Sequence, residues 1–283
     1  MIKQNLHLLI VDPQNDFCDL PAAICGCAKP SLPVTGAHAD MMRVSRLIAQ
    51  AGAGLTAITV TLDTHQRLDI AHPGFWQKAD GSAVAPFTPI TTHQVRSGVF
   101  IPRRPGALQR VLVYLEALEA TGRYTHMVWP VHCEIGTWGH NVHPELRAVC
   151  SRWEELALNP IAWVMKGVNP WTEHFSAVQA EVPDPLDPST QVNHVLLEAL
   201  MVSDKVFIAG EAGSHCVRRT TEHLAEHFGR ERLSRLVLLE DCMSPVAGFK
   251  EEQVTFLRDM RARGLGVAQS SDALSELMAN QPI

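Results

Sequence analysis

The sequence predicts an α/β fold in which an open, mostly parallel β-sheet is flanked by helices on both faces. Three features predict it: short apolar runs rich in β-branched residues, helical periodicity between these runs, and polar residues directly after them. Hydrophobic residues make up 46% of the 283 positions, which is enough for a large buried core. Because no shift in composition marks a linker, we expect one domain over residues 1–283.

The first part of the chain has the pattern of a strand, a helix and a second strand. Residues 6–12 are apolar up to Asp12, and Pro13 follows, which is typical of a buried parallel strand that opens into a loop. A helix is predicted at about 40–50 and a β-branched strand at 55–62. Together these elements predict a βαβ unit.

The middle of the chain contains a long segment with weak periodicity. Residues 73–104 are rich in Pro, Gly and Thr, and they lead into a helical pattern at 105–120. We interpret about 73–127 as an insertion. The remaining patterns predict alternating strands and helices in the second half of the chain. The strands are expected at about 161–165, 205–209 and 235–239, and the helices at about 191–201, 214–228 and 249–263.

Composition and charge exclude several kinds of partner. The net charge of −6 provides no basic surface for a phosphate backbone, so we expect no nucleic acid. No stretch approaches the roughly twenty apolar residues that span a bilayer, and the N-terminal apolar run is too short for a signal peptide. We therefore expect no membrane association and a cytoplasmic location.

The cysteines indicate free thiols rather than a disulfide framework. There are 7, an odd number, and their spacing follows no framework pattern, so a reducing compartment is the simplest interpretation. Cys25 and Cys27 are too close together for an ordinary zinc knuckle. We interpret them as two loop cysteines, with a local metal or redox feature as the alternative.

Three residues at predicted element ends are candidates for catalysis. Cys216 falls in the first turn of a predicted helix, where the helix dipole would lower the thiol pKa and free N–H groups could hold an oxyanion. Asp12 and Lys166 each close an apolar strand. Taken alone, they could be a packed cysteine, a turn-forming aspartate and a surface lysine.

Taken together, the three residues supply what amide hydrolysis by a thiol requires. Asp12 can carry the proton, Lys166 can provide the cation that balances the charges, and Cys216 can act as the nucleophile. Since ligands bind beyond the carboxyl ends of strands in open α/β sheets, all three are expected at one edge of the sheet.

The motifs around these residues resemble those of the isochorismatase-like cysteine hydrolases. The resemblance rests on residues 11–17 (Val-Asp-Pro-Gln-Asn-Asp-Phe), on Lys166-Gly167 and on residues 210–220. It implies a Rossmann-type three-layer sandwich and a catalytic triad of Asp12, Lys166 and Cys216.

The same resemblance implies a cis peptide bond before Ala212, and an oxyanion hole formed by the N–H groups of Ala212 and Cys216. Glu211 and Gly213 depart from the usual residues of this motif. A carboxylate could therefore lie close to the oxyanion hole, or it could point away.

A second constellation predicts a metal site. Asp63 and His65 follow the second strand with alternate spacing, so both side chains can reach one ion, and His132 could be the third ligand. His72 is a further ligand or a residue behind the ligands. Such a set leaves positions open for water or substrate and suits one divalent ion, with zinc preferred and iron or manganese as alternatives.

These residues, together with residues 129–137, resemble the nicotinamidase family, whose metal binds the pyridine nitrogen of the substrate. The resemblance implies that Phe17 and Trp129 flank the ring, although core packing would also explain both. The sequence therefore predicts a metal-dependent amidohydrolase that converts nicotinamide into nicotinate and ammonia through a cysteine thioester.

Two alternatives remain open. The first is a sister hydrolase that acts on another small amide or a carbamoyl compound with the same triad. The second belongs to another class, a non-catalytic metal-binding protein in which Cys216 is a buried thiol. Self-association into a homo-oligomer, with the segment at about 73–127 as a contact, is also left open.

Overall fold

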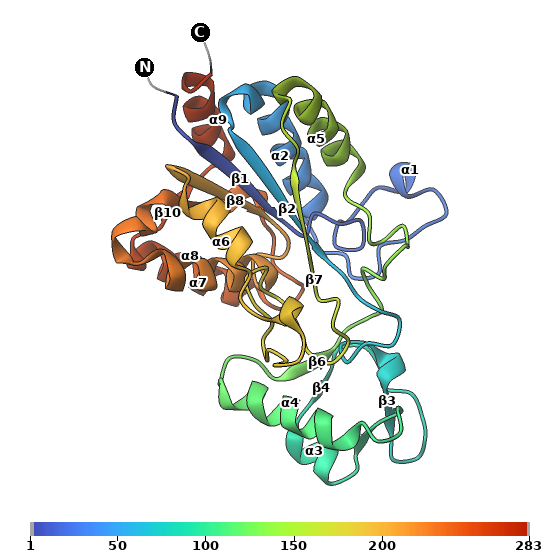
Figure 1. Ribbon diagram of the computed structural model, residues 1–283. Helices are drawn as coiled ribbons and strands as arrows, with labels where there is room; N and C mark the ends of the chain where they lie inside the picture. Colours follow the sequence, from blue (N-terminus) through green and yellow to red (C-terminus); the bar gives the residue numbers. More distant parts are fainter. Residues whose placement is uncertain (1–2, 282–283) are drawn as a thin grey trace.

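A six-stranded parallel sheet forms the centre of the computed structural model, which describes residues 3–281 (Figure 1). The strand order is β10-β9-β8-β1-β2-β7, and every pairing between neighbours is parallel. This confirms the predicted α/β class. The strands of this sheet are β1 (Leu6–Val11), β2 (Ala57–Asp63), β7 (Ala162–Lys166), β8 (Lys205–Gly210), β9 (Leu236–Leu239) and β10 (Gly266–Ala268).

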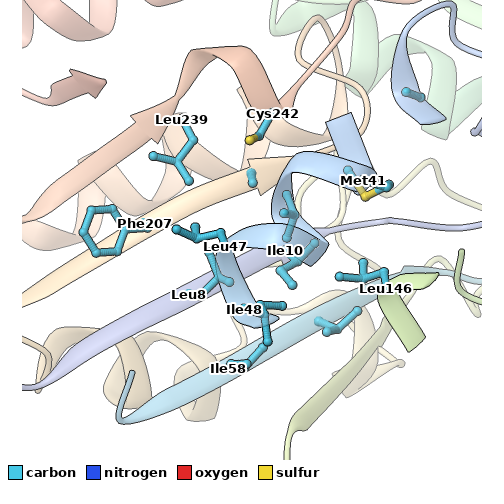
Figure 2. Close-up of a cluster of buried hydrophobic side chains, with 14 of the residues drawn as sticks. Leu8, Ile10, Met41, Leu47, Ile48, Ile58, Leu146, Phe207, Leu239 and Cys242 are labelled. Carbon is cyan, nitrogen blue, oxygen red and sulfur yellow. The ribbon is translucent and has the colours of Figure 1, made fainter. Parts of the chain in front are cut away.

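Helices cover both faces of the sheet, and the alternation of side chains along β1 divides the core between them. Leu8 and Ile10 belong to one buried cluster, shown in Figure 2, with α2 (Ala37–Ala51), α5 (Pro144–Ala157) and α9 (Ser270–Ala279). Leu9 and Val11 belong to the other, with α6 (His194–Met201), α7 (Cys216–Phe228) and α8 (Lys250–Arg263). Because both faces are apolar, β1 is buried throughout its length.

Residues 73–127 form a small lobe below the carboxyl ends of β2 and β7 in Figure 1. Its apolar side chains, including Phe75, Trp76, Val111 and Leu115, pack into a separate cluster. The lobe contains two antiparallel strand pairs and two helices: β3 (Trp76–Lys78) with β5 (Phe100–Pro102), β4 (Thr88–Ile90) with β6 (His126–Val128), α3 (Thr92–Arg96) and α4 (Leu108–Ala120).

Several short or narrow elements were not predicted. Helix α5 buries only Leu146, Cys150 and Trp153, a stripe too narrow to stand out in the sequence. Helix α9, with 10 residues, was also missed. The other missed elements have at most 6 residues: α1 (Ala22–Cys25), α3, the strands β3, β4, β5, β6 and β10, and the 3₁₀ turns Gly52–Gly54, Pro73–Phe75, Pro188–Thr190, Arg230–Arg235 and Glu240–Cys242.

Two further findings concern the whole described chain. All seven cysteines are free thiols, as expected from their spacing. Over residues 3–281, the structure has no helix with the length and hydrophobicity that a bilayer crossing requires.

Candidate active site

Asp12, Lys166 and Cys216 meet at the carboxyl edge of the sheet. Asp12 directly follows β1, Lys166 is the last residue of β7, and Cys216 begins α7 just after β8. The Nζ atom of Lys166 lies 2.9 Å from Asp12 Oδ2 and 3.6 Å from Cys216 Sγ. All three residues are buried. The ammonium therefore bridges the carboxylate and the sulfur.

The backbone at Asp12 turns its side chain toward Lys166. Asp12 has a φ of 45°, in the left-handed region that non-glycine residues seldom adopt. Thr61 holds this conformation, since its hydroxyl donates to Asp12 Oδ1 at 2.5 Å and its carbonyl accepts from the Asp12 N–H at 3.2 Å. Strain of this kind is typical of functional positions.

The electrostatics of the triad correct one prediction from the sequence. Burial raises the pKa of the Cys216 thiol well above its usual value, and Lys166 opposes this only in part. The expected lowering by the helix dipole was therefore wrong, because desolvation of a thiolate outweighs a dipole effect of about 0.3–2 kcal/mol. The resting thiol is protonated and needs a base.

Asp12 and Lys166 have the properties of that base and its counter-ion. Burial raises the pKa of Asp12, and Lys166 partly offsets the effect. Burial alone would lower the pKa of Lys166, but Asp12 and Asp63 together hold it well above its usual value. Lys166 thus keeps its charge, while Asp12 has a higher affinity for a proton than an exposed carboxylate.

The loop before Cys216 presents free N–H groups. The peptide bond between Glu211 and Ala212 is cis, as the motif implied. Within residues 3–281, the N–H groups of Ala212 and Cys216 donate to no protein acceptor. Gly210 is required here because a Cβ at this position would lie 2.0 Å from the carbonyl oxygen of Val11. These two N–H groups are available to an oxyanion.

Glu211 anchors this loop instead of lining the oxyanion hole. Its Oε2 atom accepts from the N–H of Ser244 at 3.2 Å, and the Ser244 hydroxyl donates to Asp40 at 2.6 Å. Burial, and then the charge of Asp40, raises the pKa of Glu211 well above its usual value. Glu211, which differs from the usual residue of this motif, therefore connects the loop to helix α2 through Ser244 and Asp40.

Three histidines beside the triad form a potential metal site. Nitrogen atoms of His65, His72 and His132 lie within 4.8 Å of one another, and the residues are buried. Asp63 Oδ2 lies 3.0 Å from His65 Nε2 and 3.3 Å from His132 Nε2. From the sequence, His72 was predicted to be either a further ligand or a residue behind the ligands. In the structure, it lies beside the other two histidines, within the distance that one ion could bridge.

The donor set fits a divalent cation of the borderline type. Imidazole nitrogens with one carboxylate are typical ligands of zinc and of iron or manganese. Burial and the neighbouring His65 and His132 lower the pKa of His72 strongly, so its ring is neutral, and its Nε2 atom accepts a long hydrogen bond of 3.4 Å from the N–H of His132. Asp69, which the sequence analysis missed, lies with Oδ2 3.1 Å from His65 Nδ1 and so orients that ring.

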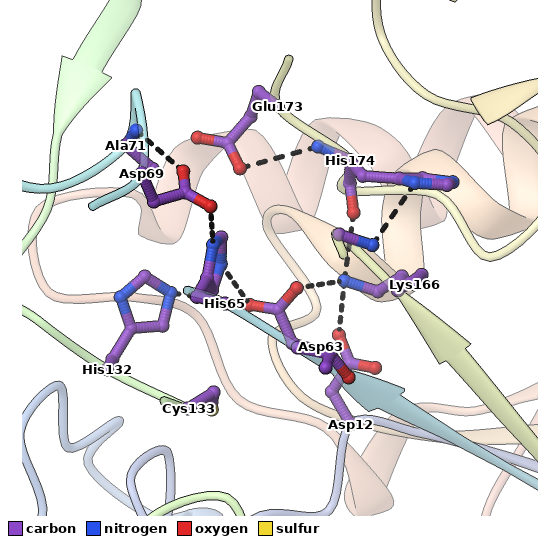
Figure 3. Close-up of polar contacts among 12 residues, drawn as sticks. Asp12, Asp63, His65, Asp69, Ala71, His132, Cys133, Lys166, Glu173 and His174 are labelled. Carbon is purple, nitrogen blue, oxygen red and sulfur yellow. Dashed lines mark hydrogen bonds and ion pairs between the residues drawn. The ribbon is translucent and has the colours of Figure 1, made fainter. Parts of the chain in front are cut away.

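Asp63 connects the histidines to the triad, as Figure 3 shows. Its Oδ1 atom accepts from Lys166 Nζ at 2.8 Å, while Oδ2 faces the histidines. Burial alone would raise the pKa of Asp63, but Lys166 and His65 hold it well below its usual value. Gln14, also missed from the sequence, fixes the Asp63 backbone through two hydrogen bonds of 2.8 Å.

A small cavity of about 30 Å³ lies between these groups. Phe17 and Trp129 are on its wall, where the resemblance to nicotinamidases placed them. Glu173 also lines it, and burial raises the pKa of this carboxyl to about 8. Glu173 was not predicted, because it is a single acid in a loop without periodicity. The complete lining is Phe17, Leu32, Asp63, Trp129, His132, Glu173, Phe175, Ala212, His215, Cys216 and Val246.

Comparison with known proteins identifies the fold. No protein-family model and no curated protein matches the sequence. Among solved structures, the chain resembles the yeast nicotinamidase at 22% identity, with 93% of this chain and 99% of that chain covered and a TM-score of 0.63.

Two other structures extend the comparison. A pyrazinamidase of Pyrococcus horikoshii in complex with zinc is 18% identical, with 94% and 99% covered and a TM-score of 0.52. An isochorismatase-like hydrolase from Alkaliphilus metalliredigens is 15% identical, with 96% and 98% covered and a TM-score of 0.51. The chain thus has the isochorismatase-like fold. Within that fold, the solved structures it resembles include nicotinamidases and pyrazinamidases.

Proposed function

We propose that this protein is a metal-dependent amidohydrolase that converts nicotinamide into nicotinate and ammonia. The observation that carries the proposal is the position of Lys166 Nζ, 2.9 Å from Asp12 and 2.8 Å from Asp63, which joins a thiol–carboxylate pair to a cluster of metal-binding side chains. The structural similarity to a yeast nicotinamidase supports the choice of substrate.

The reaction begins with a proton transfer from the thiol. Asp12 takes the proton of Cys216, and the thiolate attacks the amide carbon to form a C–S bond. The N–H groups of Ala212 and Cys216 hold the oxyanion. When the C–N bond breaks, the leaving nitrogen takes the proton from Asp12 and departs as ammonia.

Hydrolysis of the thioester repeats these steps with water. Asp12 accepts a proton from the attacking water, the C–S bond breaks, and the sulfur recovers a proton from Asp12. Lys166 keeps its charge throughout and balances each anion. Phe17 and Trp129 would hold the pyridine ring by packing on its faces.

A divalent ion at this site would act as a Lewis acid that orients the pyridine nitrogen. Asp63, His65, His72 and His132 would hold it, with zinc preferred because imidazole nitrogen dominates the set, and iron or manganese as alternatives.

Turnover of nicotinamide by the purified protein tests the proposal. Ammonia release should be measurable, should fall by about 100-fold after chelation and should return when zinc is added. Cys216→Ala should lower kcat by about 1,000-fold or more, because no nucleophile remains. Cys150→Ala, which removes a buried thiol in helix α5, is the matched control and should keep turnover. Undiminished turnover by Cys216→Ala would reject the mechanism.

A further inference from the structure

His215 is a wall residue of the cavity that the proposed mechanism does not use. Its ring is packed between three aromatic side chains: the ring centroids of Trp129, Phe175 and Phe249 lie at 5.4, 5.6 and 4.7 Å. All three contacts are edge-on, with interplanar angles of 88°, 62° and 77°. The imidazole is therefore held in one orientation beside Cys216.

Hydrogen bonding by Ser214 determines which nitrogen of His215 carries the proton. The Ser214 oxygen accepts from the N–H of Val246 at 3.0 Å and lies 2.9 Å from His215 Nδ1. Ser214 is buried, and among residues 3–281 its hydroxyl has no other acceptor. A proton on Nδ1 would leave the hydroxyl hydrogen unpaired, which is unfavourable in a buried position. The hydroxyl therefore donates to Nδ1, and the proton is on Nε2.

The Nε2–H group of His215 has no acceptor within the part of the chain that the structure describes, and protein atoms do not enclose it. Burial, with a smaller effect of Arg218, lowers the pKa of His215 to about 4, so the ring is neutral near pH 7. Trp129 Nε1, on the same wall, is buried and also lacks a protein acceptor among these residues. Buried indole N–H groups usually have a partner.

Plain nicotinamide would leave the Nε2–H donor of His215 unused. In the proposed function, its ring nitrogen faces the histidine cluster and its amide oxygen faces the N–H groups of Ala212 and Cys216. The molecule has no third acceptor for His215 Nε2–H. A site that offers a hydrogen-bond donor discriminates against ligands that lack the acceptor.

We propose that His215 is a specificity-determining residue, and that the preferred substrate is an aromatic amide whose ring carries an additional hydrogen-bond acceptor bound by His215 Nε2–H. This inference rests on the proposed amidohydrolase function and specifies its substrate class.

Matched pairs of substituted nicotinamides test the proposal. The 4-, 5- and 6-methoxy compounds carry an oxygen acceptor, and the corresponding ethyl compounds have a similar size without one. For the wild-type protein, kcat/KM should favour methoxy over ethyl by about tenfold at one ring position, which corresponds to about 1.4 kcal/mol. A ratio near one at all three positions would overturn the proposal.

Variants assign the effect to the Nε2–H group. His215→Phe keeps a flat ring but removes the donor, so the methoxy-to-ethyl ratio should fall to about one. His215→Gln restores an N–H donor near the Nε2 position and should recover part of the ratio. Phe249→Leu disturbs the same ring packing without touching a donor, and should keep the ratio. An unchanged ratio in His215→Phe would also overturn the proposal.

Binding measurements separate this inference from the proposed function. If the wild-type protein released no ammonia from nicotinamide or from any of these amides, the proposed hydrolysis would fail. Calorimetric titration of the same methoxy and ethyl compounds into wild-type and His215→Phe protein would then decide on His215 alone. The methoxy preference should again disappear in the variant; equal affinities of wild type for both compounds would contradict it.

Discussion

Lys166 is a buried ammonium whose partners explain its place in the structure. Its Nζ atom contacts Asp12 and Asp63, and donates to the carbonyl of His174 at 2.9 Å. The ammonium donates to Asp63, to this carbonyl and to Cys216 Sγ, and the charge of Asp12 lies beside it. These contacts offset the cost of removing the charge from water. Two carboxylates could not share this buried space without the cation.

Replacing Lys166 by Met should therefore affect both stability and activity. Lys166→Met leaves Asp12 as a buried carboxylate without a cation and Asp63 with only histidines beside it, and we expect a loss of about 3–5 kcal/mol in the free energy of unfolding. Turnover should be lost, because Asp12 would then hold its proton. Urea denaturation and ammonia release measure the two effects. Lys205→Met, which removes one partner of a half-buried ion pair with Glu276, is the control and should cost about 1 kcal/mol or less. Equal losses in both variants would contradict the interpretation.

At the residue scale, the sequence could predict site residues whose location follows from their position at the end of a strand or the start of a helix. Asp12, Lys166 and Cys216 were found because strand ends share one edge of a parallel sheet. The raised pKa of Cys216 could not be predicted, since it depends on how completely other segments bury the thiol. His215 was missed because its contacts with Trp129, Phe175 and Phe249 form only in the fold. Asp69 was missed because it lies in a loop without periodicity, where nothing in the sequence shows that its side chain turns back to His65.

At the element scale, the loop between β8 and α7 is held by a buried acid. Glu211 accepts from Ser244, and the N–H of Gly213 donates to the Ser244 carbonyl at 2.9 Å. Because burial raises the pKa of Glu211, the neutral carboxyl favours the folded state. This contribution is fully present below the ordinary pKa of 4.5 and is lost as the pH rises through the raised pKa in the folded protein.

Glu211→Gln should remove this pH dependence. The amide has a similar shape and an oxygen that can accept from Ser244, but it cannot ionise. The Tm of the variant should therefore fall less steeply than that of the wild type as the pH rises, and above the raised pKa the variant should be the more stable of the two. Thermal unfolding at a series of pH values, with exposed Glu226→Gln in helix α7 as control, measures the slope. Parallel curves for wild type and Glu211→Gln would rule out this role.

The elements that the sequence predicted correctly are those with a long apolar pattern. Strand β1 and helix α4 were predicted because each buries several large side chains at a regular period. Helix α5 was missed because it buries only a narrow stripe, although Pro144 in its first turn is a usual helix start, and β10 was missed because it has only 3 residues. For such elements, neighbouring segments supply most of the stabilisation.

At the scale of the whole molecule, the lobe of residues 73–127 and the metal site are connected by the chain. His72 directly precedes the lobe, and His132 follows its last strand by a few residues. The lobe also reaches the cavity wall, since the ring of Phe87 lies 6.0 Å from that of Trp129. We propose that the chain is a single domain in which this insertion positions two of the three histidines.

Packing inside the lobe should therefore control metal affinity. Leu115→Ala opens a cavity in the lobe cluster, and Leu200→Ala does the same in the cluster beneath α6; both leucines are fully buried. Each should cost about 2–5 kcal/mol in the free energy of unfolding. Only Leu115→Ala should weaken zinc binding, by about tenfold, because a looser lobe holds His72 and His132 less firmly. Competition with a chromophoric chelator measures the affinity. If both variants bound zinc as the wild type does, the lobe would be a separate appendage without influence on the site, and the histidines would owe their geometry to the sheet alone.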